Sequence, residues 1–112
     1  MAAPKPGRKV RGSRTGRPIM ALLDLLGRRW ALRVLWELRV NSLTFRDLRA
    51  SCEEMSPSVL NQRLAELRDA GIVMLQEGGG YALTPEGRIL LRELGDLDTW
   101  AKRWARRERK GG

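Results

Sequence analysis

The 112-residue sequence has no histidine and a single cysteine, Cys52. Histidine is the usual general base near neutral pH, and zinc sites are built mainly from cysteine and histidine. One cysteine cannot form an intramolecular disulfide, which fits a reducing compartment. We therefore expect neither an enzyme nor a metal site, and the sequence suggests no catalytic residue and no cofactor.

Cys52 itself is a poor candidate for a nucleophile or a redox switch. The acidic residues Glu53 and Glu54 follow it directly, and neighbouring negative charge raises the pKa of a thiol and lowers its reactivity. The sequence favours a small core or loop residue at this position. It also favours a turn-forming role for the two glutamates over an ion-binding one.

Long hydrophobic runs are missing as well. No apolar stretch approaches the roughly 18–20 residues that span a bilayer. No uninterrupted apolar segment follows the basic N-terminus, as it would in a signal peptide. We therefore expect a cytoplasmic protein without a membrane partner.

Acidic residues are scarce at both ends of the chain. Residues 1–18 carry six basic side chains and no acidic one, and residues 102–112 carry six basic side chains and one glutamate. Residues 19–101 hold ten basic and twelve acidic residues, so the middle of the chain is nearly neutral. Basic ends on a nearly neutral body suit a polyanion partner, although solubility alone would also account for them.

The composition along the chain predicts one folded domain between two basic ends. Residues 1–17 are rich in proline, glycine, serine and basic residues, and they hold too few apolar side chains to offset the entropy of ordering. We predict a disordered basic arm over residues 1–17, a domain over residues 18–105 and a basic tail over residues 106–112. The length suits one hydrophobic core.

Apolar residues at helical spacing predict three helices in the first half of the domain. The first begins at Pro18 and ends at Gly27, and the second runs from Arg29 to Arg39. The third begins at Thr44, whose hydroxyl can cap it. Two tryptophans, Trp30 and Trp36, fall on the second helix and are expected in the core.

Ser56 and Pro57 combine a capping hydroxyl with a proline suited to the first helical turn. They predict a fourth helix that reaches about Ala70, with Gly71 as a left-handed cap. Three residues share its buried side: Leu60, Leu64 and Leu67.

Two short strands, residues 72–75 and 81–83, are predicted on either side of a turn at three consecutive glycines. Thr84 and Pro85 then repeat the cap and the proline and begin a last helix that continues past Trp104. Its apolar seam is about two turns longer than a small domain needs for its own core. The predicted fold is a winged helix-turn-helix, mainly α with a small β-hairpin wing, because every cap and turn residue falls where that fold needs one.

The sequence also resembles the HxlR-type regulators, relatives of the MarR group, at four places in the same order. Residues 25–32 are similar to the family's hGxKWxh opening, and residues 45–48 to its RFxEL. Residues 56–73 are similar to its recognition-helix segment, and residues 81–87 to its YxLTxxG exit from the wing. The resemblance covers residues 18–105 and implies a dimeric transcription regulator.

Two features depart from that family's pattern. Arg17 and Pro18 stand where many members have Cys-Pro, so members that sense oxidants through that cysteine are a poor guide here. The wing, residues 76–80, is short and has no arginine at its tip, which weakens the case for a minor-groove contact by the wing.

DNA reading in such a fold is done by the helix that begins at Ser56. If the leucines face the core, Ser58, Asn61 and Gln62 point outward, with Arg63 at the edge of the buried side. Asparagine and glutamine can pair with adenine, arginine with guanine, and serine with a base or a phosphate. We predict that five residues of this helix bind DNA: Ser56, Ser58, Asn61, Gln62 and Arg63. The alternative is that they form an ordinary solvated helix face.

Four further arginines lie near the starts of helices that would flank the groove: Arg28, Arg29, Arg46 and Arg49. We predict that they contact phosphates. The alternative is that they form surface ion pairs with nearby acids, namely Asp24, Asp47 or Glu53. The N-terminal arm would suit an adjacent minor groove, and its composition would also suit RNA.

The first and last helices are the predicted dimer interface. Trp100 and Trp104 lie on the last helix, where a single domain has little left to cover them. The resemblance implies that they meet the first helix of the partner, and it allows a small-molecule effector at that interface without identifying one. The predicted interface residues are Leu22, Leu23, Leu90, Leu94, Leu97, Trp100 and Trp104.

These observations predict a homodimer that binds double-stranded DNA in a sequence-specific way and regulates transcription, as a repressor that occludes a promoter. The alternative is a winged-helix protein-interaction module that its basic arms tether to nucleic acid without sequence preference.

Overall fold

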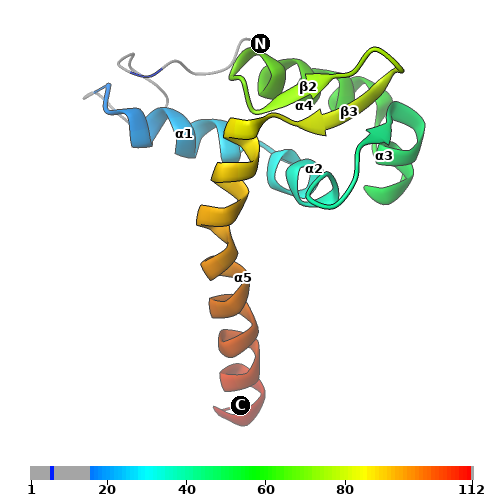
Figure 1. Ribbon diagram of the computed structural model, residues 1–112. Helices are drawn as coiled ribbons and strands as arrows, with labels where there is room; N and C mark the ends of the chain where they lie inside the picture. Colours follow the sequence, from blue (N-terminus) through cyan, green and yellow to red (C-terminus); the bar gives the residue numbers. More distant parts are fainter. Residues whose placement is uncertain (1–5, 7–15, 112) are drawn as a thin grey trace.

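The computed structural model describes residue 6 and residues 16–111 (Figure 1). Most of the predicted arm, residues 1–17, therefore lies outside the described residues. The described elements follow the predicted order with one addition, a short strand before the third helix. They are α1 (Pro18–Leu26), α2 (Ala31–Glu37), β1 (Leu43–Thr44), α3 (Phe45–Ser51), α4 (Pro57–Asp69), β2 (Val73–Leu75), β3 (Gly80–Leu83) and α5 (Pro85–Gly111).

The three predicted hydroxyl caps are confirmed. Thr44 Oγ1 accepts a hydrogen bond from the backbone N–H of Asp47 at 3.1 Å, and Ser56 Oγ accepts one from Val59 at 3.4 Å. Thr84 Oγ1 accepts from the N–H of Gly87 at 3.0 Å. Each bond satisfies a backbone donor that the helix itself leaves unpaired, so the sequence fixes where α3, α4 and α5 begin.

The second helix begins two residues later than predicted. Trp30 has a left-handed backbone, with φ of 74°, and precedes the first residue of α2. The carbonyl of Arg29 accepts a hydrogen bond from Nε of Arg63, on α4, at 2.8 Å. This tertiary hydrogen bond lies directly beside the left-handed residue, and helical periodicity alone could not reveal it.

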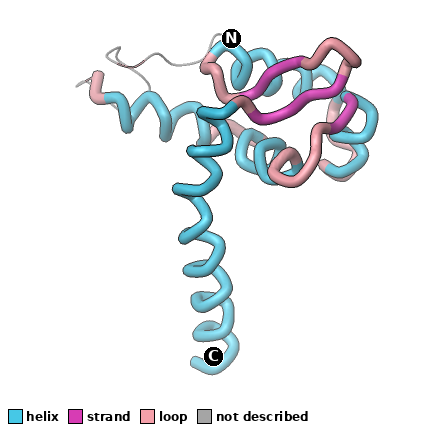
Figure 2. Tube along the Cα trace, viewed as in Figure 1, coloured by secondary structure: helices cyan, strands magenta, loops and turns pink. Residues whose placement is uncertain are grey.

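The sheet has three antiparallel strands in the order β1-β3-β2. The predicted hairpin is confirmed, and its register pairs Val73 with Leu83 and Leu75 with Tyr81. The third strand, β1, was not predicted because its two residues are too short to show an alternating pattern. Figure 2 shows the strands together at one end of the molecule, above the long last helix.

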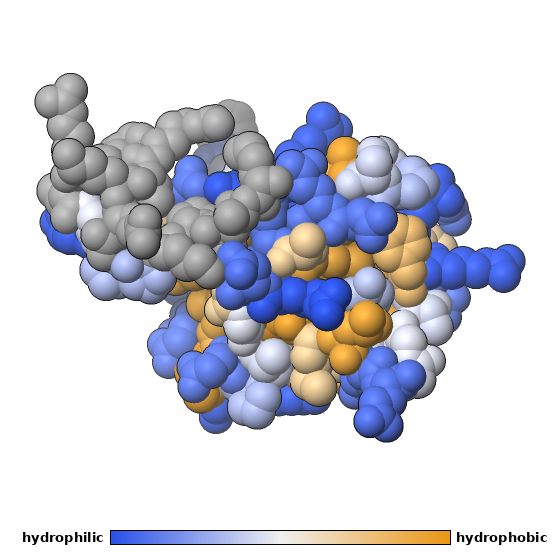
Figure 3. All heavy atoms as spheres, turned by 90° about the horizontal axis from the view of Figure 1, so that it is seen from above, coloured by the Kyte–Doolittle hydropathy of each residue, from blue (hydrophilic) through white to orange (hydrophobic). Residues whose placement is uncertain are grey.

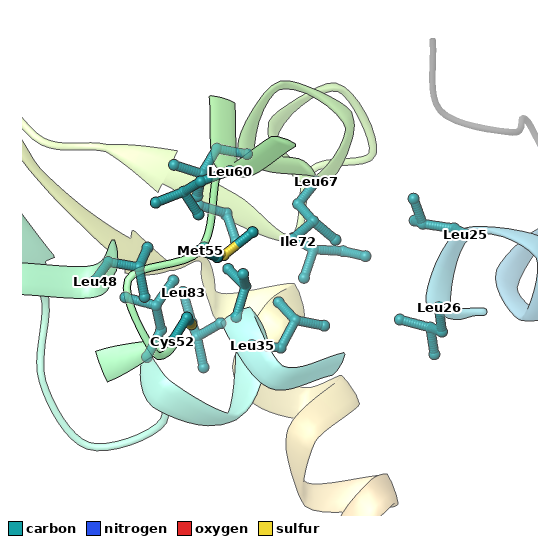
Figure 4. Packing of buried hydrophobic residues seen from close by; sticks show 14 residues of the cluster. Leu25, Leu26, Leu35, Leu48, Cys52, Met55, Leu60, Leu67, Ile72 and Leu83 are labelled. Atoms are coloured by element: carbon teal, nitrogen blue, oxygen red, sulfur yellow. The ribbon is translucent and has the colours of Figure 1, made fainter. Parts of the chain in front are cut away.

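The core lies between α2, α3, α4 and the sheet. The predicted stripe of α4 is buried, with Leu60, Leu64 and Leu67 almost inaccessible to solvent. Figure 4 shows Leu60 and Leu67 from α4 packing toward the same interior as Leu35 from α2 and Leu48 from α3. Full burial of each leucine contributes about 1.5–3 kcal/mol of stability.

The long helix α5 meets the body only through its first turns. A Cβ on Gly87 would overlap the carbonyl group of Ile72, so this glycine lets α5 begin close against the sheet. Leu90, Leu91 and Leu94 then pack partly against the core. Beyond them α5 continues away from the other elements (Figure 1), and the helix runs on through residues 106–111, where we predicted a tail.

No helix among the described residues combines the length and apolarity that a membrane crossing requires.

Candidate nucleic-acid interface

The outer side of α4 carries short polar side chains. Its leucines turn inward, and Ser58 and Asn61 are exposed while Gln62 is half-buried. The structure thus places these three predicted residues on one accessible side of one helix. A helix with this outer face is narrow enough to enter a major groove, and its amides and hydroxyls are the groups that read base edges.

The N-terminus of α4 is also accessible. Ser56 and Ser58 are exposed, and their hydroxyl oxygens lie 3.0 Å apart. The first N–H groups of a helix attract phosphate, and small side chains beside them leave room for a DNA backbone. The start of α4 therefore suits a phosphate, and its next two turns suit base edges.

Two of the predicted phosphate-binding arginines project freely. Arg29 and Arg46 are exposed, and in the described part of the chain neither side chain has a hydrogen-bond or ion-pair partner. Both lie near α4, since the backbone of Arg29 bonds to Arg63 and α3 directly precedes the turn into α4. They remain the best placed side chains for phosphate contacts beside the helix.

Arg49 is half engaged within the protein. Its Nε donates to the carbonyl of Met55 at 2.7 Å, and its Nη1 lies 3.1 Å from a carboxylate oxygen of Glu54. Glu53 and Glu54 both have left-handed backbones, with φ of 59° and 55°. Arg49 therefore stabilises the strained turn between α3 and α4. Glu53 and Glu54 form part of this turn, as predicted from the sequence.

Arg28 and Arg63 are turned inward and are committed to acids. Arg28 lies 3.0 Å from Asp24 and 2.9 Å from Glu66, and Arg63 lies 2.7 Å from Glu66. For Arg28, the structure therefore shows the ion pair with Asp24, which was the alternative to a phosphate contact. Arg28 and Arg63 are poorly suited to the candidate interface, because a guanidinium bound to a buried carboxylate is a poor donor to DNA.

Sequence reasoning missed Glu66, the acid that holds these arginines. Its side chain is only 1% exposed. Arg63 precedes Glu66 by one helical turn, and this spacing is a local sequence signal for an ion pair. Arg28 is far from Glu66 in the sequence, so no local signal indicated that pair.

The wing adds little positive charge to the interface. Its tip consists of Gln76, Glu77 and glycines, and Gly79 has φ of 93°. Strand β2 exposes Met74 and Leu75. Viewed from above, hydrophobic residues lie near the centre of the body with hydrophilic side chains around them (Figure 3).

The predicted dimer residues separate into two groups. Leu22, Leu90 and Leu94 are partly buried against the chain's own core. The others are half exposed, at 53% for Leu23, 59% for Leu97, 51% for Trp100 and 52% for Trp104. The two tryptophan rings stack with their centroids 5.9 Å apart, so they form one apolar surface on the free part of α5.

An apolar groove lies between α2 and α5. It has a volume of about 350 Å³ and is lined by Leu32, Leu35, Trp36, Leu91, Leu94 and Leu97, with Arg33 and Asp98 at its edge. Trp36, which was expected in the core, is half-buried and stacks under Arg39.

Cys52 is buried in the core, as predicted. Burial raises the pKa of its thiol, with Glu37 and Glu53 acting in the same direction and Arg33 against it. A buried thiol with a raised pKa is a weak nucleophile. The described residues contain no group of acids and cysteine arranged to hold a metal ion.

A helix-turn-helix with an accessible second helix, followed by a hairpin and a long helix, defines a winged helix-turn-helix DNA-binding protein. The family model for the HxlR-like helix-turn-helix matches residues 25–109. The chain belongs to this family, and it is a DNA-binding transcriptional regulator rather than an enzyme, which confirms the family resemblance and the fold predicted from the sequence.

Individual proteins agree with this assignment. The chain is 32% identical over 88 residues to the HTH-type transcriptional regulator YvaP of Bacillus subtilis, with 73% of this chain and 82% of that protein covered. It is similar to quinone-bound YodB of B. subtilis at 27% identity and a TM-score of 0.70, covering 76% and 94% of the two chains. A possible HxlR family transcription factor from Thermoplasma volcanium matches at 28% identity and a TM-score of 0.67, covering 76% and 82%.

Proposed function

We propose that the protein is a homodimer that binds a two-fold symmetric DNA site in a sequence-specific way and represses transcription by occluding a promoter. The observation that supports this most directly is the outer side of α4, where Ser58 and Asn61 are exposed and Gln62 is half-buried. Three leucines on the opposite side of the helix pack into the core. Such a regulator acts on the chromosome and hence in the cytoplasm.

The proposal of a dimer rests on exposed apolar residues. Leu97, Trp100 and Trp104 occupy the part of α5 that leaves the body, and Ile19 and Leu23 are exposed on α1. Exposed apolar side chains of this size are costly in water and mark a protein interface. The partner's α1 would cover the free part of α5, and the groove between α2 and α5 adjoins that surface.

The test is selection of bound sequences from random duplexes with the full-length protein, at several salt concentrations. We expect a palindrome whose half-sites are about one helical turn apart, because a two-fold dimer presents two copies of α4. No preferred sequence at any salt concentration would contradict the proposal.

Removal of residues 1–17 separates this function from the interaction module. If α4 reads the site, the truncated protein keeps the same preferred sequence with weaker affinity, because the arm supplies only phosphate attraction. If the arms merely tether a protein-binding domain, truncation abolishes nearly all DNA binding.

A further inference from the structure

A buried glutamate joins α4 to the α1–α2 corner. Glu66 lies on α4 with a side chain that is 1% exposed, and its two carboxylate oxygens face different arginines. Oε1 accepts a hydrogen bond from Nη1 of Arg63 at 2.7 Å. Oε2 lies 2.9 Å from Nη1 of Arg28, an ion pair whose angles are outside those of a hydrogen bond.

Arg28 carries the connection into α1. Its Nη2 donates to Asp24 Oδ2 at 3.0 Å, and Asp24 is on α1. The side chain of Arg28 is 17% exposed and that of Arg63 is 14% exposed, so water screens these pairs weakly. One guanidinium thus bridges an acid on α1 and an acid on α4.

Arg63 carries a second connection, to the backbone of the corner. Its Nε donates to the carbonyl of Arg29 at 2.8 Å, just before the left-handed Trp30 that precedes α2. The Glu66 cluster, defined as Asp24, Arg28, Arg63 and Glu66, therefore ties α4 to both α1 and the turn that follows α1.

Stability alone is a weak explanation for this cluster. Well-packed apolar residues of similar volume often replace a buried ion pair without loss of stability. Leucine contacts are non-directional and tolerate small rotations of a helix. By contrast, the hydrogen bond from Arg63 Nε to the carbonyl of Arg29 is directional, and the Glu66–Arg28 ion pair limits the distance between α4 and the corner. The cluster is thus suited to orient α4 rather than to hold it in the fold.

We propose that Glu66 is a positioning residue that sets the angle and distance of α4 relative to α1, and thereby the half-site spacing that the dimer accepts. This inference rests on the proposed function, in which α1 belongs to the dimer interface and α4 reads DNA. Each extra base pair moves a half-site by about 3.4 Å and rotates it by about 34°, so a small error in this angle is measurable as altered spacing preference.

The test compares the wild-type protein with an apolar replacement of the cluster, Arg28→Met, Glu66→Leu and Arg63→Met together. We expect this variant to fold and dimerise like the wild type. Its affinity for the selected operator should fall about tenfold, a typical size for coupling through a packed network. It should also lose most of its preference for the native spacer over spacers that are one or two base pairs longer or shorter.

Lys102→Gln is the matched control. It removes one positive charge, the same net change as the triple variant, and breaks only the pair of Lys102 with Asp98 at 3.2 Å on the free part of α5. Its spacing preference should equal that of the wild type. Glu66→Gln is a second variant that keeps the shape of the side chain and should relax the spacing preference to a smaller extent.

Wild-type spacing preference in the folded triple variant would overturn the inference. If the triple variant fails to fold, the spacing preference of the Glu66→Gln variant is the test. An unchanged spacing preference in that variant also overturns the inference. A wild-type protein that selects no duplex contradicts the proposed function instead, so the two failures are distinguishable.

Discussion

The outer side of α4 and the outer side of α5 are both exposed, yet their chemistry differs. On α4 the accessible residues are short and polar, namely Ser58, Asn61 and Gln62, whereas on α5 they are large and apolar, namely Leu97, Trp100 and Trp104. Polar groups remain hydrated until a ligand replaces the water, but apolar groups of this size lower the free energy only when another surface covers them. This difference supports the proposal that α4 meets DNA part of the time and that α5 meets its partner much more permanently.

The largest effect is expected from a charge placed on the apolar surface of α5. Leu97→Glu should convert the proposed dimer to a monomer and lower the affinity for a palindromic site by about 100-fold or more, because the two half-sites would no longer be bound together. Sedimentation equilibrium and fluorescence anisotropy measure the two quantities.

Val40→Glu is the control for Leu97→Glu. Val40 is also highly exposed, but it lies in the loop after α2, so this variant should stay dimeric and bind normally. A dimeric Leu97→Glu protein would remove the distinction drawn between the two surfaces.

The next effect concerns the polar side of α4. Asn61→Ala combined with Gln62→Ala should reduce the preference for the selected site over random DNA by roughly 10- to 100-fold, since a bidentate base contact is worth about 1–3 kcal/mol. Melting temperature and oligomeric state should not change, because neither side chain belongs to the core. Asn41→Ala removes an exposed amide outside α4 and should leave the preference intact.

A smaller effect separates the basic residues of the body from those of α5. Arg46→Gln should lower the slope of log affinity against log salt by about 1, as expected for one lost phosphate contact. Arg106→Gln removes the same charge from the distant end of α5, which points away from the body (Figure 1). An equal change of slope in both variants would show that position on the molecule does not matter.

The smallest effect comes from Cys52, which lies inside the core and on neither surface. Burial raises the pKa of its thiol above the ordinary value of 9.0. The unfolded chain therefore loses this proton at a lower pH than the folded one, and the contribution to stability is full below about pH 9 and declines above it. Wild type should lose more unfolding free energy than Cys52→Ala between pH 8 and 10 in denaturant titrations, while DNA binding stays insensitive to thiol reagents. Equal losses in the two proteins would contradict the pKa direction.

Much of the fold could be predicted because its signals are local. Thr44, Ser56 and Thr84 cap helices through bonds that span three residues, and Gly71 has the left-handed backbone expected of a glycine that ends a helix. The inward side of α4 follows from the 3.6-residue period. The two-residue strand β1 carries no such period, and it forms only because β3 lies beside it.

The candidate interface could be predicted only in part. Asn61 and Ser58 face outward because the leucines on the same helix face inward, which a single helix determines. The role of an arginine depends instead on which acid reaches it. Arg46 and Arg28 look alike in the sequence, but Glu66 from a distant helix occupies Arg28 and leaves Arg46 exposed.

By itself the sequence determined the order of the helices and of the hairpin, the starts of α3, α4 and α5, and the side of α4 that remains available. Those properties arise from backbone capping and from periodic burial, whose partners are within a few residues of one another. The tertiary structure decided the left-handed turn at Trp30 and the buried position of Glu66. These depend on contacts between residues that are distant in the chain, and a contact of that kind leaves no periodic trace in the sequence.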